Sequence, residues 1–435
     1  MTAEIGILNK SAVVIAADSA VTIGNGRKVF NTANKIFQLS YNDAVGIMIY
    51  NNANWMGIPL ELIIKIYRDK ITKKFSELED CADDFMLFLD TEFKKHIEED
   101  IKSEVIEYKL YESLDIITDS VTEIIDENIR QKIITRPKTE DEERTYFEQT
   151  LLEYLDVLTS KKDFPKSANL KAYSITKFSK TYNTVFEKVI SGFLSIQKIS
   201  EKNHLQTKKL IVLRLYQEIV SEINDDDDFT GIVIAGYGLD EIYPSIIDIR
   251  LSFLIDNIIK VEKVKNLKIT SNRTAIVKPF AQREMVDTFF QGIDPQLDEK
   301  TNELLIDLLD AFKNDLIEKY KTKISKNFLE KKLSNLLKTF YEKTDEIRKE
   351  IHIDPIITTI EVLRKEDLIE IAESLVGITT LKRKATLDIE TVGGPVDIAV
   401  ITKGEGFVWI KRKENINKEL NHIFFEREMK KINNL

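Results

Sequence analysis

Residues 13–22 decide the fold class of this chain, and they read Val13-Val14-Ile15-Ala16-Ala17-Asp18-Ser19-Ala20-Val21-Thr22. The first five are apolar and three of them are β-branched, which is typical of a short buried strand. The polar pair Asp18-Ser19 then ends the run. Similar apolar runs occupy residues 5–8 and 44–49, and another begins just after Lys35. The N-terminal part of the chain is therefore predicted to form strands.

Glycines divide the rest of the chain into strand-like and helix-like zones. They cluster in residues 6–57, 231–238 and 393–406, whereas long stretches between these clusters hold almost none. Residues 232–235 and 245–251 read as a strand pair, and the two glycines between residues 401 and 407 mark a hairpin. The glycine-poor zones carry apolar residues at helical spacing. The pattern predicts distant β-rich zones that share one sheet system, with helices packed on it or projecting from it.

Composition excludes several classes of protein. The 435 residues carry 63 basic and 73 acidic side chains, so the formal net charge is −10, which argues against non-specific nucleic-acid binding. Cys81 is the single cysteine and the four histidines are far apart, so we expect no disulfide framework and no zinc centre. Secretory and membrane-spanning patterns are absent, which predicts a soluble cytoplasmic protein with no membrane partner.

Motifs that would hold a phosphate or an activated serine are also missing. No G-x-x-x-x-G-K-[ST] loop and no G-x-S-x-G elbow occur, and Gly236-Tyr237-Gly238 is too short to cradle a phosphate. The acidic run at residues 224–228 is expected to be a solvated loop. A divalent-metal site there is the weaker alternative, because consecutive carboxylates cannot all face one ion. We therefore expect no cofactor and no metal.

Thr2 is the candidate nucleophile, because it directly follows Met1. Removal of Met1 would place a free α-amine and a hydroxyl on one residue, and the amine, with an ordinary pKa of about 8, can accept the hydroxyl proton. A cation nearby would lower the pKa of the amine, and Lys35 held by Asp18 is the candidate. From the residues alone, Thr2 is also an ordinary second residue, Asp18 a turn or cap residue, and Lys35 a surface lysine beside a strand.

The order of these residues resembles the start of proteasome β-subunits and of the simpler bacterial peptidase rings of that superfamily. There the mature chain begins with threonine, Ala-Ala-Asp-Ser ends the second strand, and a lysine precedes the next strand. The resemblance implies Thr2 as nucleophile and base, Lys35 as the cation that lowers the amine pKa, and Asp18 as the carboxylate that holds Lys35. It also implies a peptide or protein substrate, a homo-oligomer, and a separate ATP-driven unfoldase as partner.

The resemblance returns later in the chain. Residues 231–246 resemble the central hairpin of the family, residues 279–282 the opening of a helix, residues 369–380 the last core helix, and residues 393–407 the closing strands. The implied fold is α+β, a four-layer αββα sandwich of the N-terminal-nucleophile hydrolase type with large helical insertions. The expected division is a core in residues 1–100, 229–295 and 362–412, helical insertions in residues 101–228 and 296–361, and a tail helix in residues 413–435.

The supporting positions depart from the family. The turn after the third strand is glycine-rich in the family and its backbone N–H groups form the oxyanion hole. Here that turn holds Tyr50 and Asn51, and the Tyr50 side chain would narrow the substrate channel. Two family serines fall at Ile276 and Val392. In the closing segment, the nearest residues that could take over the supporting role are Asp388 and Thr391.

Two functions follow. The first is a threonine peptidase or amidase, which Thr2, Asp18 and Lys35 favour. The second is an inactive scaffold or sensor whose helical insertions bind a regulatory or defence partner protein, which the missing serines and Tyr50 favour. Residues 101–228 are dense in apolar groups, so we expect them to mediate a homo-oligomer smaller than a closed double ring.

Overall fold

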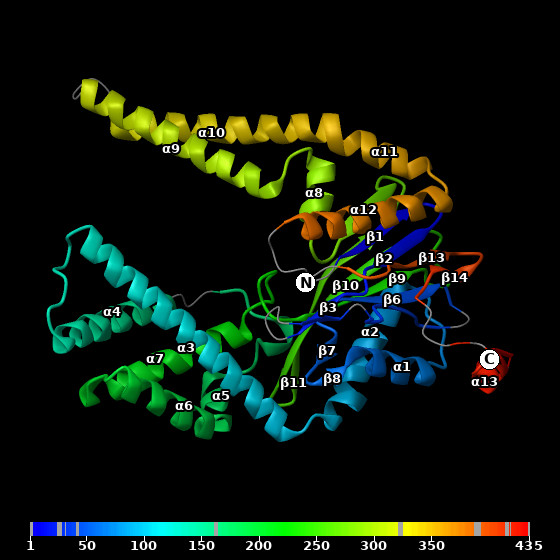
Figure 1. Cartoon of the computed structure of the whole chain (residues 1–435), viewed down its shortest axis with the longest axis horizontal. Coiled ribbons are helices and arrows are strands. Elements are labelled where there is room, and N and C mark those ends of the chain that lie inside the picture. The colour runs from blue at the N-terminus through cyan, green and yellow to red at the C-terminus, as the bar shows by residue number, and fades with distance from the viewer. Residues whose placement is uncertain are drawn as a thin grey trace.

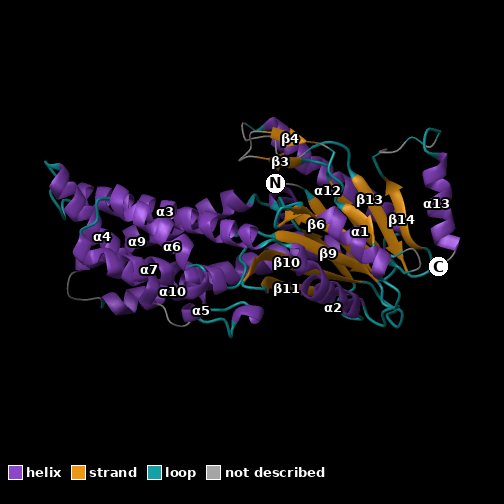
Figure 2. Ribbon diagram, turned by 90° about the horizontal axis from the view of Figure 1, so that it is seen from below, coloured by secondary structure: helices purple, strands orange, loops and turns teal. Residues whose placement is uncertain are grey.

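The computed structural model of the chain describes residues 3–23, 28–30, 32–40, 43–160, 164–320, 325–386, 393–413, 417 and 419–433. It contains two five-stranded antiparallel sheets flanked by helices, and two helical projections leave the sheets on the same side (Figures 1 and 2). The protein is therefore α+β, as the apolar runs and the glycine zones predicted.

The first sheet gathers strands from both ends of the chain. Its order is β12-β1-β2-β13-β14, with antiparallel neighbours throughout. The strands are β1 (Glu4–Asn9), β2 (Val13–Ala17), β12 (Ala275–Pro279), β13 (Asp397–Thr402) and β14 (Gly406–Lys411). β13 and β14 form the hairpin predicted near the C-terminus. β2 pairs with β1 on one side and with β13 on the other, so it is the central strand.

The second sheet has the order β11-β10-β9-β6-β5 and is also antiparallel. Its strands are β5 (Ile36–Gln38), β6 (Val45–Asn51), β9 (Thr230–Gly236), β10 (Ser245–Ile255) and β11 (Ile258–Lys268). β9 and β10 form the strand pair predicted around the glycines at 236 and 238. The short hairpins β3 (Val21–Ile23) with β4 (Lys28–Phe30), and β7 (Asn54–Trp55) with β8 (Ile58–Pro59), form two further small sheets.

Both faces of β2 are covered, which explains its uninterrupted apolar sequence. Val13 and Ile15 belong to the cluster that also contains residues of the second sheet. Val14 and Ala16 belong to another cluster, with residues of helix α12 (Lys365–Ala385). A strand that is buried on both faces has no position for an exposed polar side chain, so its sequence is a continuous apolar run.

The helices fall into groups that follow the chain. α1 (Leu60–Lys70) and α2 (Leu78–Phe88) share a cluster with the outer residues of the second sheet. The first projection contains α3 (Glu99–Arg130), α4 (Glu140–Ser160), α5 (Ile175–Thr181), α6 (Asn183–Ile196) and α7 (Glu201–Val220). After α8 (Glu284–Gln291), the second projection contains α9 (Pro295–Tyr320) and α10 (Lys326–Arg348), and α11 (Asp354–Val362) leads back to α12. α13 (His422–Asn433) follows β14.

The two projections differ in how they are anchored. Buried residues of α3, α4, α6 and α7 belong to the same cluster as residues of β6, β9 and β10. The first projection is therefore an extension of the core of the second sheet. In α9 and α10, by contrast, no described side chain is buried. Figure 1 shows this second pair of helices extending beside the first projection.

Tyr50, near the end of β6, occupies space between the sheets. Its ring packs edge-on to Phe229 at 5.9 Å and against Phe280 at 5.5 Å between centroids. Its hydroxyl donates a hydrogen bond of 2.7 Å to Asp248 Oδ1. The ring also lies against Gly231, where a Cβ atom would approach it to 2.0 Å. Glycine at 231 is therefore required by the packing of Tyr50.

Candidate functional site

Lys35 lies at the centre of a buried cluster formed by three strand ends. Asp18 follows β2, Glu4 begins β1, and Lys35 immediately precedes β5. The Nζ of Lys35 lies 2.5 Å from Asp18 Oδ1 and 3.1 Å from Glu4 Oε1. Its side chain is 3% exposed and both carboxylates are fully buried. The ion pair that the resemblance implied between Asp18 and Lys35 is therefore present, whereas the contact with Glu4 was not anticipated.

Asp18 is also held by the backbone. The amide of Ala3 donates to Asp18 Oδ1 at 3.2 Å, and the amide of Gly393 donates to Asp18 Oδ2 at 2.9 Å. The amide of Asp18 in turn donates to the carbonyl of Ala3 at 3.0 Å. Hydrogen bonds to an ionised carboxylate are stronger than neutral ones, so they fix this side chain in one orientation. Residue 3 and residue 393 are thereby brought to the same carboxylate.

A second lysine, the half-buried Lys413, contacts the residues around this cluster. Lys413 Nζ donates to Asp397 Oδ2 at 2.7 Å, to Ser19 Oγ at 2.8 Å and to the carbonyl of Ala33 at 2.5 Å. Ser19 Oγ itself donates to the carbonyl of Pro395 at 2.6 Å. These contacts join the segment after Asp18 to the segment before Lys35. Lys413 therefore helps to set the distance between the two residues of the ion pair.

Glu4 and Lys413 were not among the site residues predicted from the sequence. Lys413 is the last of three consecutive basic residues, Lys411-Arg412-Lys413. The sequence pattern does not distinguish it from its two neighbours. Glu4 is directly followed by the apolar run of β1 and reads as a polar residue at a strand end. Asp397 lies in the closing segment that the resemblance covers, which was the one available signal. Long-range contacts decide all three roles.

Three of the predicted site residues lie outside the described residues, namely Thr2, Asp388 and Thr391. Ala3 and Gly393, which directly follow the two undescribed segments, both contact Asp18. The described residue that borders each of these two segments therefore lies beside the Asp18–Lys35 ion pair. The catalytic roles of these residues stay predictions.

Tyr50 and Asn51 differ in how their backbone is used. The amide of Ile49 donates to the carbonyl of Lys35 at 2.8 Å, toward β5. Successive N–H groups along a strand point to opposite neighbours, so the N–H of Tyr50 points toward β9 and that of Asn51 back toward Lys35. Asn51 has φ 66° and is exposed at the end of β6. Of the two candidate oxyanion donors, the geometry favours the backbone of Asn51.

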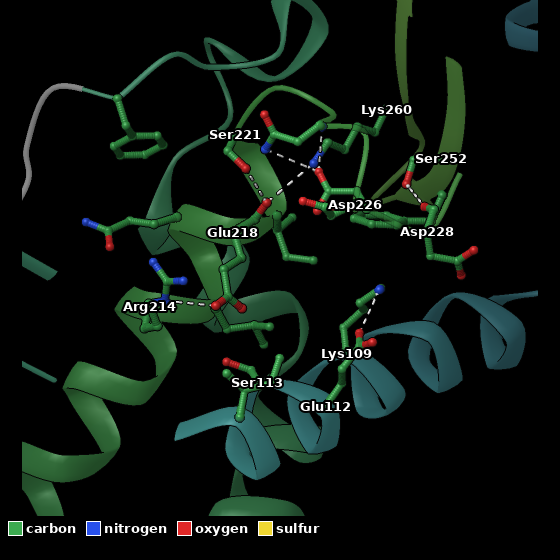
Figure 3. Close-up of a pocket in the computed structure, with 18 of the residues that line it drawn as sticks. Lys109, Glu112, Ser113, Arg214, Glu218, Ser221, Asp226, Asp228, Ser252 and Lys260 are labelled. Carbon is green, nitrogen blue, oxygen red and sulfur yellow. Dashed lines mark hydrogen bonds and ion pairs between the residues drawn. The ribbon is translucent and has the colours of Figure 1, made fainter. Parts of the chain in front are cut away.

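A cavity of about 450 Å³ lies away from this cluster, where the first projection meets the second sheet (Figure 3). α3, α7, the loop before β9, and strands β10 and β11 supply its walls. Lys109 Nζ lies 2.7 Å from Glu112 Oε2, and Arg214 Nε lies 2.8 Å from Glu218 Oε1. These four charged groups pair with one another, and Asp226, Asp227 and Asp228 also line the cavity.

Lys260 is the most deeply buried cation in the walls of this cavity, at 3% exposed. Its Nζ donates to the carbonyl of Glu218 at 3.4 Å and lies 5.6 Å from the centroid of the Phe253 ring. Burial lowers the pKa of Lys260 from 10.5 to about 8. The charged form is therefore disfavoured in the folded protein relative to the unfolded chain.

Replacing Lys260 by methionine is expected to stabilise the protein at pH 7 by on the order of 3 kcal/mol. A depressed lysine pKa contributes stability that is fully present above about pH 10.5 and lost as the pH falls through about 8. The advantage of Lys260→Met should therefore be large at pH 7 and small at pH 10.5. Urea unfolding at both pH values measures it, with Lys265→Met, an exposed position on the same strand, as the control. An equal gain at both pH values would contradict the assignment.

No group of three or more histidine, cysteine, aspartate or glutamate side chains with the geometry of a metal site occurs among the described residues. None of the helices in the described part of the chain is long and apolar enough to cross a membrane.

No protein-family model and no curated protein matches this sequence. Among solved structures, the chain is similar to the Anbu (Gly-1) mutant from Hyphomicrobium sp. strain MC1, with 7% sequence identity and a TM-score of 0.27. The alignment covers 100% of this chain and 98% of that chain.

Proposed function

We propose that this protein is an N-terminal threonine hydrolase that cleaves amide bonds in peptides or proteins. One observation carries the proposal: the amide nitrogen of Ala3 lies 3.2 Å from the carboxylate oxygen that Lys35 also contacts. Thr2 is bonded to that nitrogen. Once Met1 is removed, its amine and hydroxyl would belong to the residue next to a buried, fixed cation.

The chemistry needs the residues in this arrangement. The hydroxyl oxygen of Thr2 attacks the substrate carbonyl carbon and its proton passes to the α-amine of Thr2. Lys35 keeps the pKa of that amine low enough for it to act as a base at neutral pH. The backbone N–H of Asn51 stabilises the developing oxyanion. The amine of the substrate leaves with the proton, and water then hydrolyses the threonine ester.

The fold we propose for this site is the four-layer αββα sandwich of the N-terminal-nucleophile hydrolases. Its support is the order of the apolar clusters. One cluster joins the first sheet to α12, one joins the two sheets, and one joins the second sheet to α1 and α2. In this proposal the division into a core and two insertions is the one expected from the sequence, with the insertions as the two projections.

A scaffold without catalysis is the second candidate, and the position of Tyr50 favours it. The Tyr50 ring occupies space between the sheets and contacts Phe229, Phe280 and Gly231. If substrate must enter there, this side chain stands in its way. In that case the helical projections would carry the function by binding a protein partner.

Mass spectrometry of the protein isolated from its native cell separates the two candidates. We expect the intact mass to show that Met1 is absent, because the mechanism needs a free amine on Thr2. We also expect a threonine-directed electrophile, such as an epoxyketone, to add once per chain at Thr2. A chain that fully retains Met1, or a processed chain that stays unlabelled at saturating reagent, excludes the hydrolase.

A further inference from the structure

Helices α9 and α10 form an antiparallel hairpin whose register is fixed at its base. Asp298, in the first turn of α9, forms an ion pair with Arg348, the last residue of α10. Counting inward from this pair at equal rise along both helices places Leu305 beside Tyr341 and Leu309 beside Leu337. The two helices lie side by side in Figure 1 and extend away from the sheets.

One stripe on each helix faces the other helix. The half-buried residues of α9 include Leu305, Leu309 and Leu316, and those of α10 include Leu333, Leu337 and Tyr341. These positions recur four or seven residues apart, so each set lies on one side of its helix. The α10 stripe is not closed over by α9, because a groove of about 550 Å³ lies along Leu333, Leu337 and Tyr341. In the described residues of both helices, the apolar side chains are at most half-buried.

A second apolar stripe on each helix is exposed to solvent. Every residue of this stripe directly precedes a half-buried position, and it is 43% to 59% exposed. The stripe consists of Leu297, Leu304, Leu308 and Phe312 on α9, and of Phe328, Leu336, Phe340 and Ile347 on α10. We call these eight residues the hairpin face.

The hairpin face is one continuous surface, and its geometry follows from the sequence offset. Two antiparallel helices are related by a two-fold axis perpendicular to the plane that contains them. A rotation about that axis superimposes one helix on the other and leaves every residue on the same side of the plane. A residue that directly precedes an inward position on one helix is therefore placed on a residue that directly precedes an inward position on the other. Because both exposed stripes precede the inward stripe by one residue, they emerge on the same side of the hairpin. Ile306, which follows an inward residue, lies on the opposite side.

We propose that the hairpin face binds the hairpin face of a second copy of this chain, so that the four helices form a bundle. Such a face is large for a surface left in water, where contiguous apolar patches are usually small. A stable dimer buries roughly 800 Å² on each partner, and eight large apolar side chains that are about half exposed approach that area. The proposal does not depend on the hydrolase assignment.

Charge selects a second copy and also its orientation. α9 carries seven acidic residues and three lysines, a net charge of −4, whereas α10 carries six basic and four acidic residues, a net charge of +2. Opposite charges are brought together if α9 packs on α10 of the second copy. A two-fold axis parallel to the helices produces this arrangement, with neighbouring helices antiparallel as in four-helix bundles. The two cores then lie at the same end of the bundle.

One charged pair on the same surface tests this orientation. Asp315 and Lys332 each directly precede a half-buried position, as the residues of the hairpin face do. In the register set by the Asp298–Arg348 ion pair they lie at nearly the same height along the hairpin. With the two-fold axis parallel to the helices, Asp315 of one copy therefore faces Lys332 of the other copy. An axis perpendicular to the helices would instead place α9 against α9.

Sedimentation equilibrium of the full chain at tens of micromolar tests the dimer. The wild type should have twice the chain mass. The double variant Leu308→Glu with Leu336→Glu should dissociate at least about 100-fold more readily, because four carboxylates would enter the apolar seam. The matched control is Ile306→Glu, on the opposite side of α9, and it should leave the dimer intact. Circular dichroism verifies that all three proteins are folded.

Mixing two single variants tests the orientation. Asp315→Lys and Lys332→Asp should each weaken the dimer on their own, because each homodimer then opposes like charges. An equimolar mixture should regain the dimer, since each chain then meets an opposite charge on the other. A monomeric wild type, or a double variant that keeps the wild-type mass, overturns the proposal, and in the second case the contact lies elsewhere. A mixture as weak as either variant overturns the parallel axis.

Discussion

Replacing Thr2 by alanine is expected to abolish amide hydrolysis, with a loss of at least about 10³-fold in rate, and to leave the fold unchanged. The hydroxyl oxygen is the attacking atom in the proposed mechanism, so nothing replaces it when it is removed. The alanine removes only a small group near the end of the chain. Turnover of a fluorogenic peptide library and covalent labelling by an electrophile measure the effect.

Thr2→Ser is the matched control for this prediction. Serine keeps both the hydroxyl and the α-amine on the first residue, so it should retain labelling and at least part of the turnover. Thermal unfolding should give similar midpoints for the wild type and both variants. Peptide turnover that survives in Thr2→Ala would show that the nucleophile is a different residue.

Replacing Lys35 by alanine is expected to destabilise the protein by about 3–5 kcal/mol, because two buried carboxylates would lose their common cation. Both Asp18 and Glu4 are fully buried, so neither carboxylate is in contact with bulk solvent in the folded protein. The same variant should lose labelling at Thr2, since the amine would no longer have a neighbouring cation. Chemical denaturation measures the free energy of unfolding.

Lys65→Ala serves as the control for the loss of a lysine from an ion pair. Lys65 pairs with Glu61 on the surface of α1, where the side chains are 49% and 34% exposed. Exposed pairs contribute about 0–1 kcal/mol, so this variant should be nearly as stable as the wild type. If Lys35→Ala also costs less than 1 kcal/mol, the carboxylates are not dependent on Lys35. Lys35→Arg keeps the charge and separates stability from positioning.

Sequence could predict the strands whose burial is unambiguous. β2 is buried on both faces, so its apolar run admits no interpretation as a surface helix, and the β13–β14 hairpin carries its own turn glycines. The partners of these strands were harder to predict. The ion pair between Asp18 and Lys35 could be predicted only from the resemblance, because the spacing of residues along the chain does not show which strand ends lie close together. Once the positions of β2 and β5 are known, Asp18 and Lys35 lie close together, because Asp18 directly follows β2 and Lys35 directly precedes β5.

The contacts that could not be predicted from the sequence depend on register between distant strands. Tyr50 was predicted to narrow a channel, but its hydrogen bond to Asp248 depends on how β6, β9 and β10 are aligned. A shift of one residue would turn its side chain to the other face of the sheet. Lys413 and Glu4 raise the same difficulty, because a charged residue at a strand end reads as exposed until its neighbours are known.

The position of β13 beside β2 has a consequence for biosynthesis. Asp18 accepts one of its two backbone hydrogen bonds from Gly393, 375 residues later, and Ser19 accepts a hydrogen bond from Lys413, 394 residues later. A ribosome must therefore make at least the first 413 residues before all of these contacts can form. Contacts of such long sequence separation form late and slowly. The nascent protein carries Asp18 and Lys35 from the start, yet it completes their surroundings only after Gly393 and Lys413 have been added.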